Sequence, residues 1–123
     1  RYSMRIFVVD DSRAMRMIVV RTLHLAGYEE HEIVQAANGR EAVAAITAAP
    51  PDLVLCDWNM PEMSGLELLT ALRGAGWHVP FGFVTSEAAP QMREQALAAG
   101  AMFLIAKPFT PEDFQEALDP VLA

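Results

Sequence analysis

Residues 6–11 spell Ile-Phe-Val-Val-Asp-Asp, a short apolar run that ends in two acidic residues. Three further apolar runs end in a charged or hydroxyl side chain: 53–56 before Asp57, 81–84 before Thr85, and 105–106 before Lys107. If the four runs are parallel strands, their carboxyl ends lie together at the edge where open α/β sheets bind ligands. The pattern therefore predicts a crevice with three carboxylates, a hydroxyl and an ammonium group, which suits a divalent cation and a phosphoryl group.

Strand and helix patterns alternate five times along the chain. The expected strands are residues 5–9, 32–36, 52–56, 80–84 and 102–106. The expected helices run from Ser12 to a stop at Gly27, from Asn38-Gly39 to Pro50, over 65–74, over 88–99, and from Pro111 to an end or kink at Pro120. Because the strands are almost continuously apolar, the sequence predicts a doubly wound α/β fold, with helices on both faces of a parallel sheet.

Composition narrows the classes of protein. The chain has 123 residues, which we expect to form one domain, and a net charge of −7 that argues against direct nucleic-acid binding. Its apolar runs are far shorter than the roughly 20 residues of a membrane span. The single cysteine, Cys56, is expected to be a small buried side chain, and the absence of a disulfide pair suits the cytoplasm.

Asp10, Asp11 and Asp57 are the candidate cation ligands. Two carboxylates about 4 Å apart repel by roughly 4 kcal/mol at an effective dielectric near 20, so three together need a cation or a proton. Asp10 and Asp11 alone could simply begin a helix, where negative charge suits the dipole. Asp57 at the next strand end weakens that alternative, and oxygen ligands in an open crevice favour Mg²⁺. The three histidines are isolated and expected at the surface: His24, His31 and His78.

Lys107 is the only lysine of the chain, and Pro108 follows it directly. An ammonium group at a strand end would pair with the carboxylates or with a phosphoryl group. A cis Lys107-Pro108 peptide bond would be one way to direct the lysine inward, because cis bonds are essentially confined to proline. The hydroxyl of Thr85 can donate to a phosphoryl oxygen, although a strand-end threonine alone carries little weight.

Five separated motifs resemble the receiver domain of bacterial response regulators over residues 4–122, and single-domain chemotaxis regulators in particular. They are Val9-Asp10-Asp11-Ser12, Cys56-Asp57-Trp58-Asn59-Met60-Pro61, Gly65, Val84-Thr85-Ser86-Glu87 and Lys107-Pro108-Phe109. The resemblance implies a response regulatory (receiver) domain over 1–123, folded as a (βα)5 flavodoxin-like, three-layer sandwich with strand order 2-1-3-4-5.

The resemblance also implies a role for each matching residue. Asp57 would accept a phosphoryl group from a histidine kinase or histidine phosphotransfer protein. The other implied roles are Mg²⁺ binding by Asp10, Asp11, Asp57 and the Asn59 backbone carbonyl, phosphoryl binding by Thr85 and Lys107, and tuning of dephosphorylation by Asn59 and Glu87. An unknown output partner protein would read the phosphorylated surface, and the chain would be a signalling domain and not an enzyme.

Two further features concern the strand before Lys107 and the exposed side of the first helix. The family usually has Tyr or Phe three residues before the lysine, but here that position is Leu104, and strand alternation points Phe103 to the other face. In the first helix, a core stripe is expected from Met15, Ile18, Val19, Thr22 and Leu23. That stripe leaves Met17 and Val20 as exposed apolar residues, a candidate docking patch for the phosphodonor.

Alternatives remain open. The chain could be a free-standing regulator, a receiver excised from a larger response regulator or hybrid kinase, or a phosphate sink. A haloacid-dehalogenase-like phosphatase would need a second carboxylate where Asn59 stands. A flavin-binding module would need a phosphate loop, which Asp10 and Asp11 disfavour.

Overall fold

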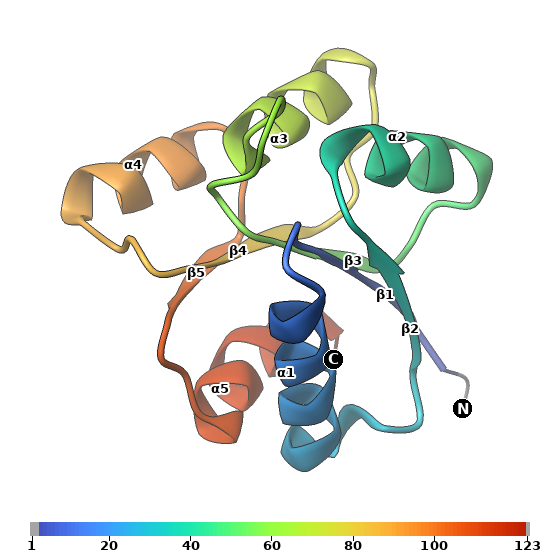
Figure 1. Ribbon diagram of the computed structural model, residues 1–123, viewed down its shortest axis with the longest axis vertical. Coiled ribbons are helices and arrows are strands. Elements are labelled where there is room, and N and C mark those ends of the chain that lie inside the picture. Colours follow the sequence, from blue (N-terminus) through green and yellow to red (C-terminus); the bar gives the residue numbers. More distant parts are fainter. Residues whose placement is uncertain (1–2, 123) are drawn as a thin grey trace.

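The structure is a computed structural model that describes residues 3–122, and its centre is a five-stranded parallel sheet (Figure 1). The strands are β1 (Arg5–Val9), β2 (Glu32–Ala36), β3 (Leu53–Cys56), β4 (Phe81–Thr85) and β5 (Phe103–Ala106). They lie in the order β2-β1-β3-β4-β5, and every neighbouring pair is parallel. The predicted fold class and strand order are confirmed.

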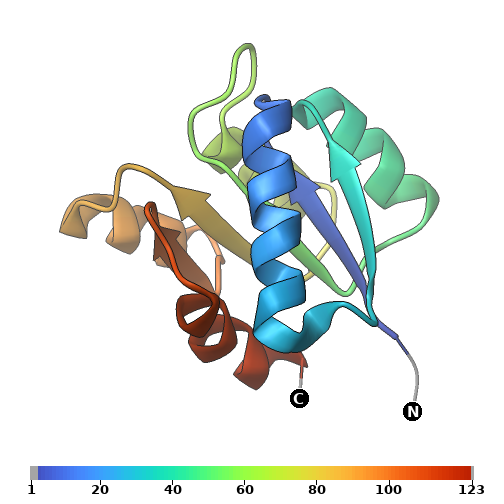
Figure 2. The same cartoon turned by 60° about the horizontal axis from the view of Figure 1, so that its bottom comes forward.

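Helices cover both faces of the sheet and complete three layers. They are α1 (Arg13–Leu23), the short π-helical turn η1 (His24–Tyr28), α2 (Gly39–Ala48), α3 (Gly65–Gly74), α4 (Pro90–Ala98) and α5 (Pro111–Leu122). Figure 1 shows α2, α3 and α4 on one face, with α1 and α5 on the other. In Figure 2, α1 crosses in front of the sheet along β1 and β2.

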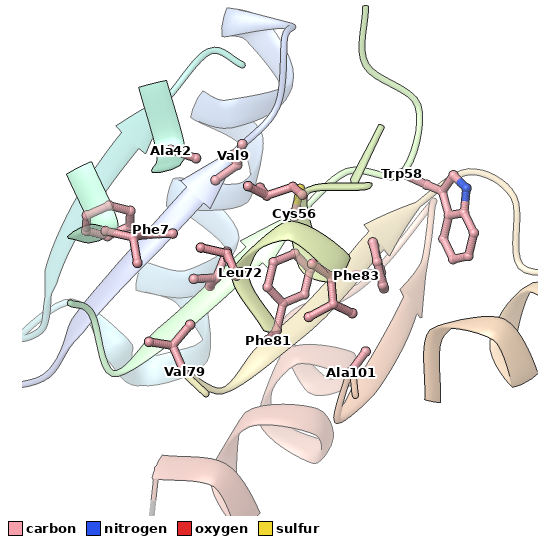
Figure 3. Close-up of a cluster of buried hydrophobic side chains, with 14 of the residues drawn as sticks. Phe7, Val9, Ala42, Cys56, Trp58, Leu72, Val79, Phe81, Phe83 and Ala101 are labelled. Carbon is pink, nitrogen blue, oxygen red and sulfur yellow. The ribbon is translucent and has the colours of Figure 1, made fainter. Parts of the chain in front are cut away.

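Strand alternation divides the core into two clusters. In β1, Phe7 and Val9 face the α2–α4 layer, whereas Ile6 and Val8 face α1 and α5. Figure 3 shows the first cluster, in which the rings of Phe81 and Phe83 lie beside Leu72 and Trp58. Because both faces of the central strands are buried, the strands are held rigidly and their carboxyl ends are fixed in position.

Helices α1, α2 and α3, like α5, begin with a side-chain cap that the sequence supplies locally. Ser12 accepts a hydrogen bond from the backbone N–H of Met15, at 3.2 Å, and so begins α1 directly after the acidic pair. Asn38 caps α2 in the same way, and Ser64 forms a capping box with Glu67 at the start of α3. These caps fix the ends of the loops that follow β1, β2 and β3.

The predictions for two helix ends and one histidine have different outcomes. Gly27 has a φ of 99°, outside the helical range, so it interrupts the helical backbone within η1, as predicted. Pro120 does not end α5, which extends to Leu122, and a kink at Pro120 stays a prediction. His31, expected at the surface, is partly buried, and its Nδ1 accepts a hydrogen bond from the Met4 backbone N–H at 2.9 Å. None of the helices within residues 3–122 is long and apolar enough to cross a membrane.

Candidate functional site

The candidate site lies at the carboxyl ends of β1, β3, β4 and β5, where hydrogen bonds of the sheet extend one residue beyond the strands. The backbone N–H of Asp57 donates to the carbonyl of Val9 at 2.9 Å, and that of Lys107 donates to the carbonyl of Thr85 at 2.8 Å. Asp57 and Lys107 therefore have backbones fixed by the sheet, although they belong to connecting loops. The predicted meeting of strand ends is confirmed.

The structure brings the three aspartates into one cluster. Carboxylate oxygens of Asp10, Asp11 and Asp57 all lie within 4.8 Å of one another. Asp10 is buried, Asp57 is half-buried and Asp11 is exposed, so the cluster opens to solvent on one side. An open set of hard oxygen donors fits Mg²⁺, which binds one or two protein carboxylates and keeps several waters.

Lys107 bridges the two less exposed carboxylates. Its Nζ lies 3.5 Å from Asp10 Oδ2 and 3.5 Å from Asp57 Oδ1. The Lys107-Pro108 peptide bond is cis, as the sequence suggested. The lone lysine of the chain therefore points into the site, and its positive charge offsets part of the repulsion among the aspartates.

Opposing influences act on the acidity of Asp57. Burial raises the pKa of its carboxyl group, and the neighbouring Asp10 raises it further. The ammonium group of Lys107 and the hydrogen bond from the Trp58 backbone N–H to Asp57 Oδ1, at 2.9 Å, lower the pKa. The net direction is upward, mainly because burial disfavours the charged form, which a nearby cation would stabilise.

Thr85 ends β4, and Asn59 and Glu87 lie in the loops after β3 and β4, at the same edge of the sheet as the aspartates. Thr85 is fully buried, and its Oγ1 accepts a hydrogen bond from the Glu87 backbone N–H at 3.2 Å. The Asn59 side-chain amide donates to Glu87 Oε1, which links the loop after β3 to the loop after β4. The hydroxyl proton of Thr85 remains free to donate, because Oγ1 acts as the acceptor in its bond with Glu87.

Gly65 is required by the close approach of its backbone to Asp57. A Cβ atom at this position would lie 2.2 Å from the Asp57 carbonyl oxygen, and the Gly65 N–H donates to the Trp58 carbonyl at 2.8 Å. The first turn of α3 therefore packs directly against the backbone of the candidate phosphoacceptor. The Cys56 side chain is buried, as expected, and its Sγ donates to the Asp57 carbonyl. Burial raises the pKa of its thiol.

The exposed residues on α1 differ from the expectation. Met17 is 56% exposed, as predicted, but Val20 is only partly exposed and packs against the core cluster on the α1 and α5 side. Ile18, expected inside, is 49% exposed. The docking patch proposed as Met17 and Val20 is therefore corrected to Met17 and Ile18. The helix lies rotated relative to the expected stripe, so that Val19, Thr22 and Leu23 form its buried face.

The two residues at the altered aromatic position face as predicted. Leu104 is buried in the cluster on the α2–α4 side, and Phe103 packs against the cluster on the α1 and α5 side. The ring of Phe103 lies over Gly82, where a Cβ atom would come within 2.1 Å of it. The aromatic ring at this end of β5 therefore lies on the opposite face of the sheet from Leu104 and Thr85.

One residue of the site escaped the sequence interpretation. Arg16 donates from Nη1 to the backbone carbonyl of Asp10 at 2.7 Å and from Nε to Gln35 Oε1 at 3.0 Å. In the sequence it is only one of three scattered arginines of the first helix. Its position six residues after Asp10, within two turns of the cap at Ser12, was the available signal.

Comparison with known proteins agrees with this geometry. The family model described as response regulator receiver domain matches residues 6–119. The chemotaxis protein CheY1 of Helicobacter pylori is 39% identical over 122 residues, which cover 97% of this chain and 97% of that protein. A chemotaxis protein CheY homolog of Campylobacter jejuni is 40% identical and covers 97% of this chain and 92% of its own length.

Solved structures give the same result. The chemotaxis protein CheY4 of Vibrio cholerae superposes with a TM-score of 0.85 at 36% identity, covering 97% of this chain and 98% of that one. Since the family model covers nearly the whole chain and the relatives match it from end to end, the chain belongs to the response regulator receiver family, as a receiver domain of the CheY type.

Proposed function

We propose that residues 1–123 act as one phospho-accepting receiver domain, in which Asp57 takes a phosphoryl group from a phosphohistidine of a histidine kinase or histidine phosphotransfer protein. A carboxylate oxygen of Asp57 forms a bond to phosphorus while the bond between phosphorus and the histidine nitrogen breaks. The imidazole leaves with the electron pair. Hydrolysis of the acyl phosphate by water then restores the carboxylate and ends the signal.

The observation that carries this proposal is the position of the Asp57 carboxylate. It stands at a strand end, half-buried, with two carboxylates within 4.8 Å and an ammonium nitrogen at 3.5 Å. Phosphoryl transfer depends mainly on positioning and charge neutralisation, because the reacting group itself needs little covalent assistance. A carboxylate with cation ligands and an ammonium group around it offers both.

Mg²⁺ is the proposed cofactor, held by Asp10, Asp11, Asp57 and the Asn59 backbone carbonyl. When bound, the ion neutralises charge on the phosphoryl oxygens. Lys107 would turn from the carboxylates to a phosphoryl oxygen, and Thr85 would donate its free hydroxyl proton to another. Asn59 and Glu87, joined by a hydrogen bond between the loops after β3 and β4, would set how readily water reaches the acyl phosphate.

The output of the reaction is a changed surface for a partner protein, and we propose that it acts in chemotaxis in the cytoplasm, with no metabolite turned over. The chemotaxis proteins among its relatives support this assignment. A receiver that belongs to a larger regulator, or a phosphate sink, would use the same chemistry. The phosphatase alternative is disfavoured because Asn59 stands where a second carboxylate is needed, and its amide is engaged with Glu87.

Intact-mass spectrometry after incubation with acetyl phosphate tests the proposal. The wild type should gain the mass of one phosphoryl group only when Mg²⁺ is present, and Asp57→Asn should gain none. Asp52→Asn is the matched control, because Asp52 lies at the other end of β3 and accepts a hydrogen bond from the Arg5 backbone. Labelling of Asp57→Asn at the wild-type rate would overturn the assignment of the phosphoacceptor.

A further inference from the structure

Arg16 joins three parts of the fold behind the carboxylate cluster. From the second turn of α1, its guanidinium donates to the Asp10 carbonyl at 2.7 Å and to Gln35 Oε1 on β2 at 3.0 Å. Its own backbone N–H donates to the Ser12 carbonyl at 2.9 Å. The planar guanidinium presents its donors in a fixed fork, so these bonds restrain the direction of the Asp10 carbonyl and not only its distance.

The Asp10 carbonyl belongs to the peptide group that joins Asp10 to Asp11. Because a peptide group is planar, holding its oxygen also fixes the orientation of the Asp11 N–H and restricts the backbone on both sides. The Asp10 side chain has further restraints, since Oδ1 accepts from the Ser12 N–H at 2.9 Å and Oδ2 lies 3.5 Å from Lys107 Nζ.

Asp11 lacks such restraints. Its side chain is exposed and, within residues 3–122, takes part in no hydrogen bond or ion pair. Yet its carboxylate lies within 4.8 Å of the carboxylates of Asp10 and Asp57. The backbone conformation at Asp11, which sets the direction of its side chain, is therefore what keeps the carboxylate in the cluster.

We propose that Arg16 is a positioning residue of the Mg²⁺ site: by holding the Asp10–Asp11 peptide group against β2, it aims the Asp11 carboxylate at the cation. This inference rests on the proposed function, because it assumes that the cluster binds Mg²⁺. It assigns to an arginine the part that outer hydrogen-bond partners play at metal sites, where they orient the ligands without touching the metal.

The positive charge of Arg16 allows the test to separate an electrostatic effect on Mg²⁺ binding from a positioning effect. A guanidinium near an acidic cluster repels a cation, so losing the charge alone would tighten Mg²⁺ binding. Losing the positioning role would weaken binding. The two explanations therefore predict opposite signs for Arg16→Gln. Arg16→Lys separates them further, since lysine keeps the charge but cannot offer the planar fork to both acceptors.

Mg²⁺ affinity is measured by isothermal titration calorimetry and by the fluorescence of Trp58, which directly follows Asp57, in a Trp77→Phe background. Arg16→Gln should bind Mg²⁺ about 10-fold more weakly than the wild type, the scale seen when outer partners of metal ligands are removed. Arg16→Lys should also bind more weakly. The matched control is Arg13→Gln, an exposed arginine of the same helix, which should bind as tightly as the wild type or tighter.

The hydrogen bond between Arg16 and Gln35 on β2 allows a second test. Gln35→Ala should weaken Mg²⁺ binding in the wild type, and it should have little further effect in Arg16→Gln because the shared hydrogen bond is already lost. Thermal melts in the presence of a chelator establish that each variant is folded. If Arg16→Gln fails to fold, the conclusion is taken from Arg16→Lys, which makes the smallest change at this position.

The outcomes separate this inference from the proposed function. If folded Arg16→Gln and Arg16→Lys bind Mg²⁺ as tightly as the wild type or tighter, the positioning role is wrong while the metal site stands. If the wild type itself binds no Mg²⁺, the proposed function fails along with it.

Discussion

The environment of the Asp57 side chain raises the pKa of its carboxyl group above the ordinary value. Burial has the largest effect and Asp10 adds to it, while Lys107 and the Trp58 N–H lower the pKa by less. A charged carboxylate whose folded-state pKa is raised lowers the stability of the folded chain at any pH above that pKa. A bound cation would offset this loss, because it would favour the charged form.

Asp57→Asn should therefore raise the melting temperature of the metal-free protein at pH 7. The folded-state pKa lies above the ordinary value of 3.8, so the charged wild-type carboxylate lowers stability above the raised pKa. That loss disappears as the pH falls through the raised pKa towards 3.8, below which both states are protonated. The gain from Asn should shrink over the same range of pH.

Thermal melts of both proteins with a chelator, between pH 7 and acid, measure this effect. Asp52→Asn is the control, because its carboxylate accepts a hydrogen bond that an asparagine oxygen can also accept. A loss of stability in Asp57→Asn at pH 7 would contradict the electrostatic interpretation.

Gly65 gives a second prediction at the scale of one residue. Gly65→Ala places a Cβ atom 2.2 Å from the Asp57 carbonyl oxygen, which is a backbone atom and cannot move easily. We expect the free energy of unfolding to fall by about 1–3 kcal/mol, the usual cost of forcing atoms into a packed site. Urea denaturation measures the change.

The matched control for Gly65 lies at the other end of the same helix. A Cβ atom on Gly74 meets nothing within 4 Å apart from its chain neighbours and its own helix backbone, and Gly74→Ala should stabilise the protein by about 0.4–1 kcal/mol. Equal effects of the two substitutions would show that helix propensity, and not the approach to Asp57, explains the glycine at position 65.

At the scale of the element, α1 has two distinct tasks. Its N-terminus is capped by Ser12 next to the acidic pair, and its buried face, Val19, Thr22 and Leu23, holds it on the sheet. These contacts leave Met17 and Ile18 exposed on the helix that follows the carboxylate cluster. An apolar pair beside the site is suited to a phosphodonor, which must come close to Asp57.

Met17→Glu should slow phosphoryl transfer from the cognate kinase by about 10-fold or more, as expected for loss of an apolar anchor in an interface. It should leave labelling by acetyl phosphate unchanged, because the small donor needs no docking surface. Stopped-flow measurement of both reactions tests this.

Met102→Glu is the control, because Met102 is also exposed (54%, against 56% for Met17) but lies at the opposite end of the sheet. Equal slowing of both donors by Met17→Glu would indicate damage to the site and not loss of docking.

At the scale of the whole molecule, the proposed phosphorylation of Asp57 would have to change the structure of a surface away from the site. Leu104 and Phe103 both line a groove of about 410 Å³ bounded by α4, β5 and α5. Leu104 pairs with Phe83 in the sheet, on the side of Thr85, while the Phe103 ring lies over Gly82 on the other side. No aromatic ring stands at the position where the family usually has one, so ring rotation at residue 104 cannot carry the signal.

We therefore expect the signal to pass through the loop after β4. In the proposed function, a hydrogen bond from the Thr85 hydroxyl to a phosphoryl oxygen would distinguish the two states, as any ligand-driven change requires. Comparison of the free and beryllofluoride-bound protein by NMR should show large shifts for residues 85–89 and little change in the Leu104 side chain. A coupled change of the Leu104 rotamer would instead show that leucine takes the role of the aromatic ring.

The sequence by itself determined the order of elements and the chemistry of the strand ends. The residue that ends each apolar run is fixed by the chain, so Asp10, Asp57, Thr85 and Lys107 lie at one edge of a parallel sheet. Their meeting also needs the strand order, which the family resemblance implied and the structure shows. Local caps also set the helix starts at Ser12, Asn38 and Ser64. These features depend on neighbours in the chain, which the sequence shows directly.

Only the tertiary structure decided which side of each helix is buried and which distant groups meet. Residues 17–20 of α1 are all apolar, so periodicity alone could not separate Ile18, which is exposed, from Val20, which packs on the core. The angle at which the helix docks on the sheet made that choice. The bond of Arg16 to Gln35 likewise depends on β2 lying beside β1, because contacts between residues far apart in the chain form only when the sheet assembles.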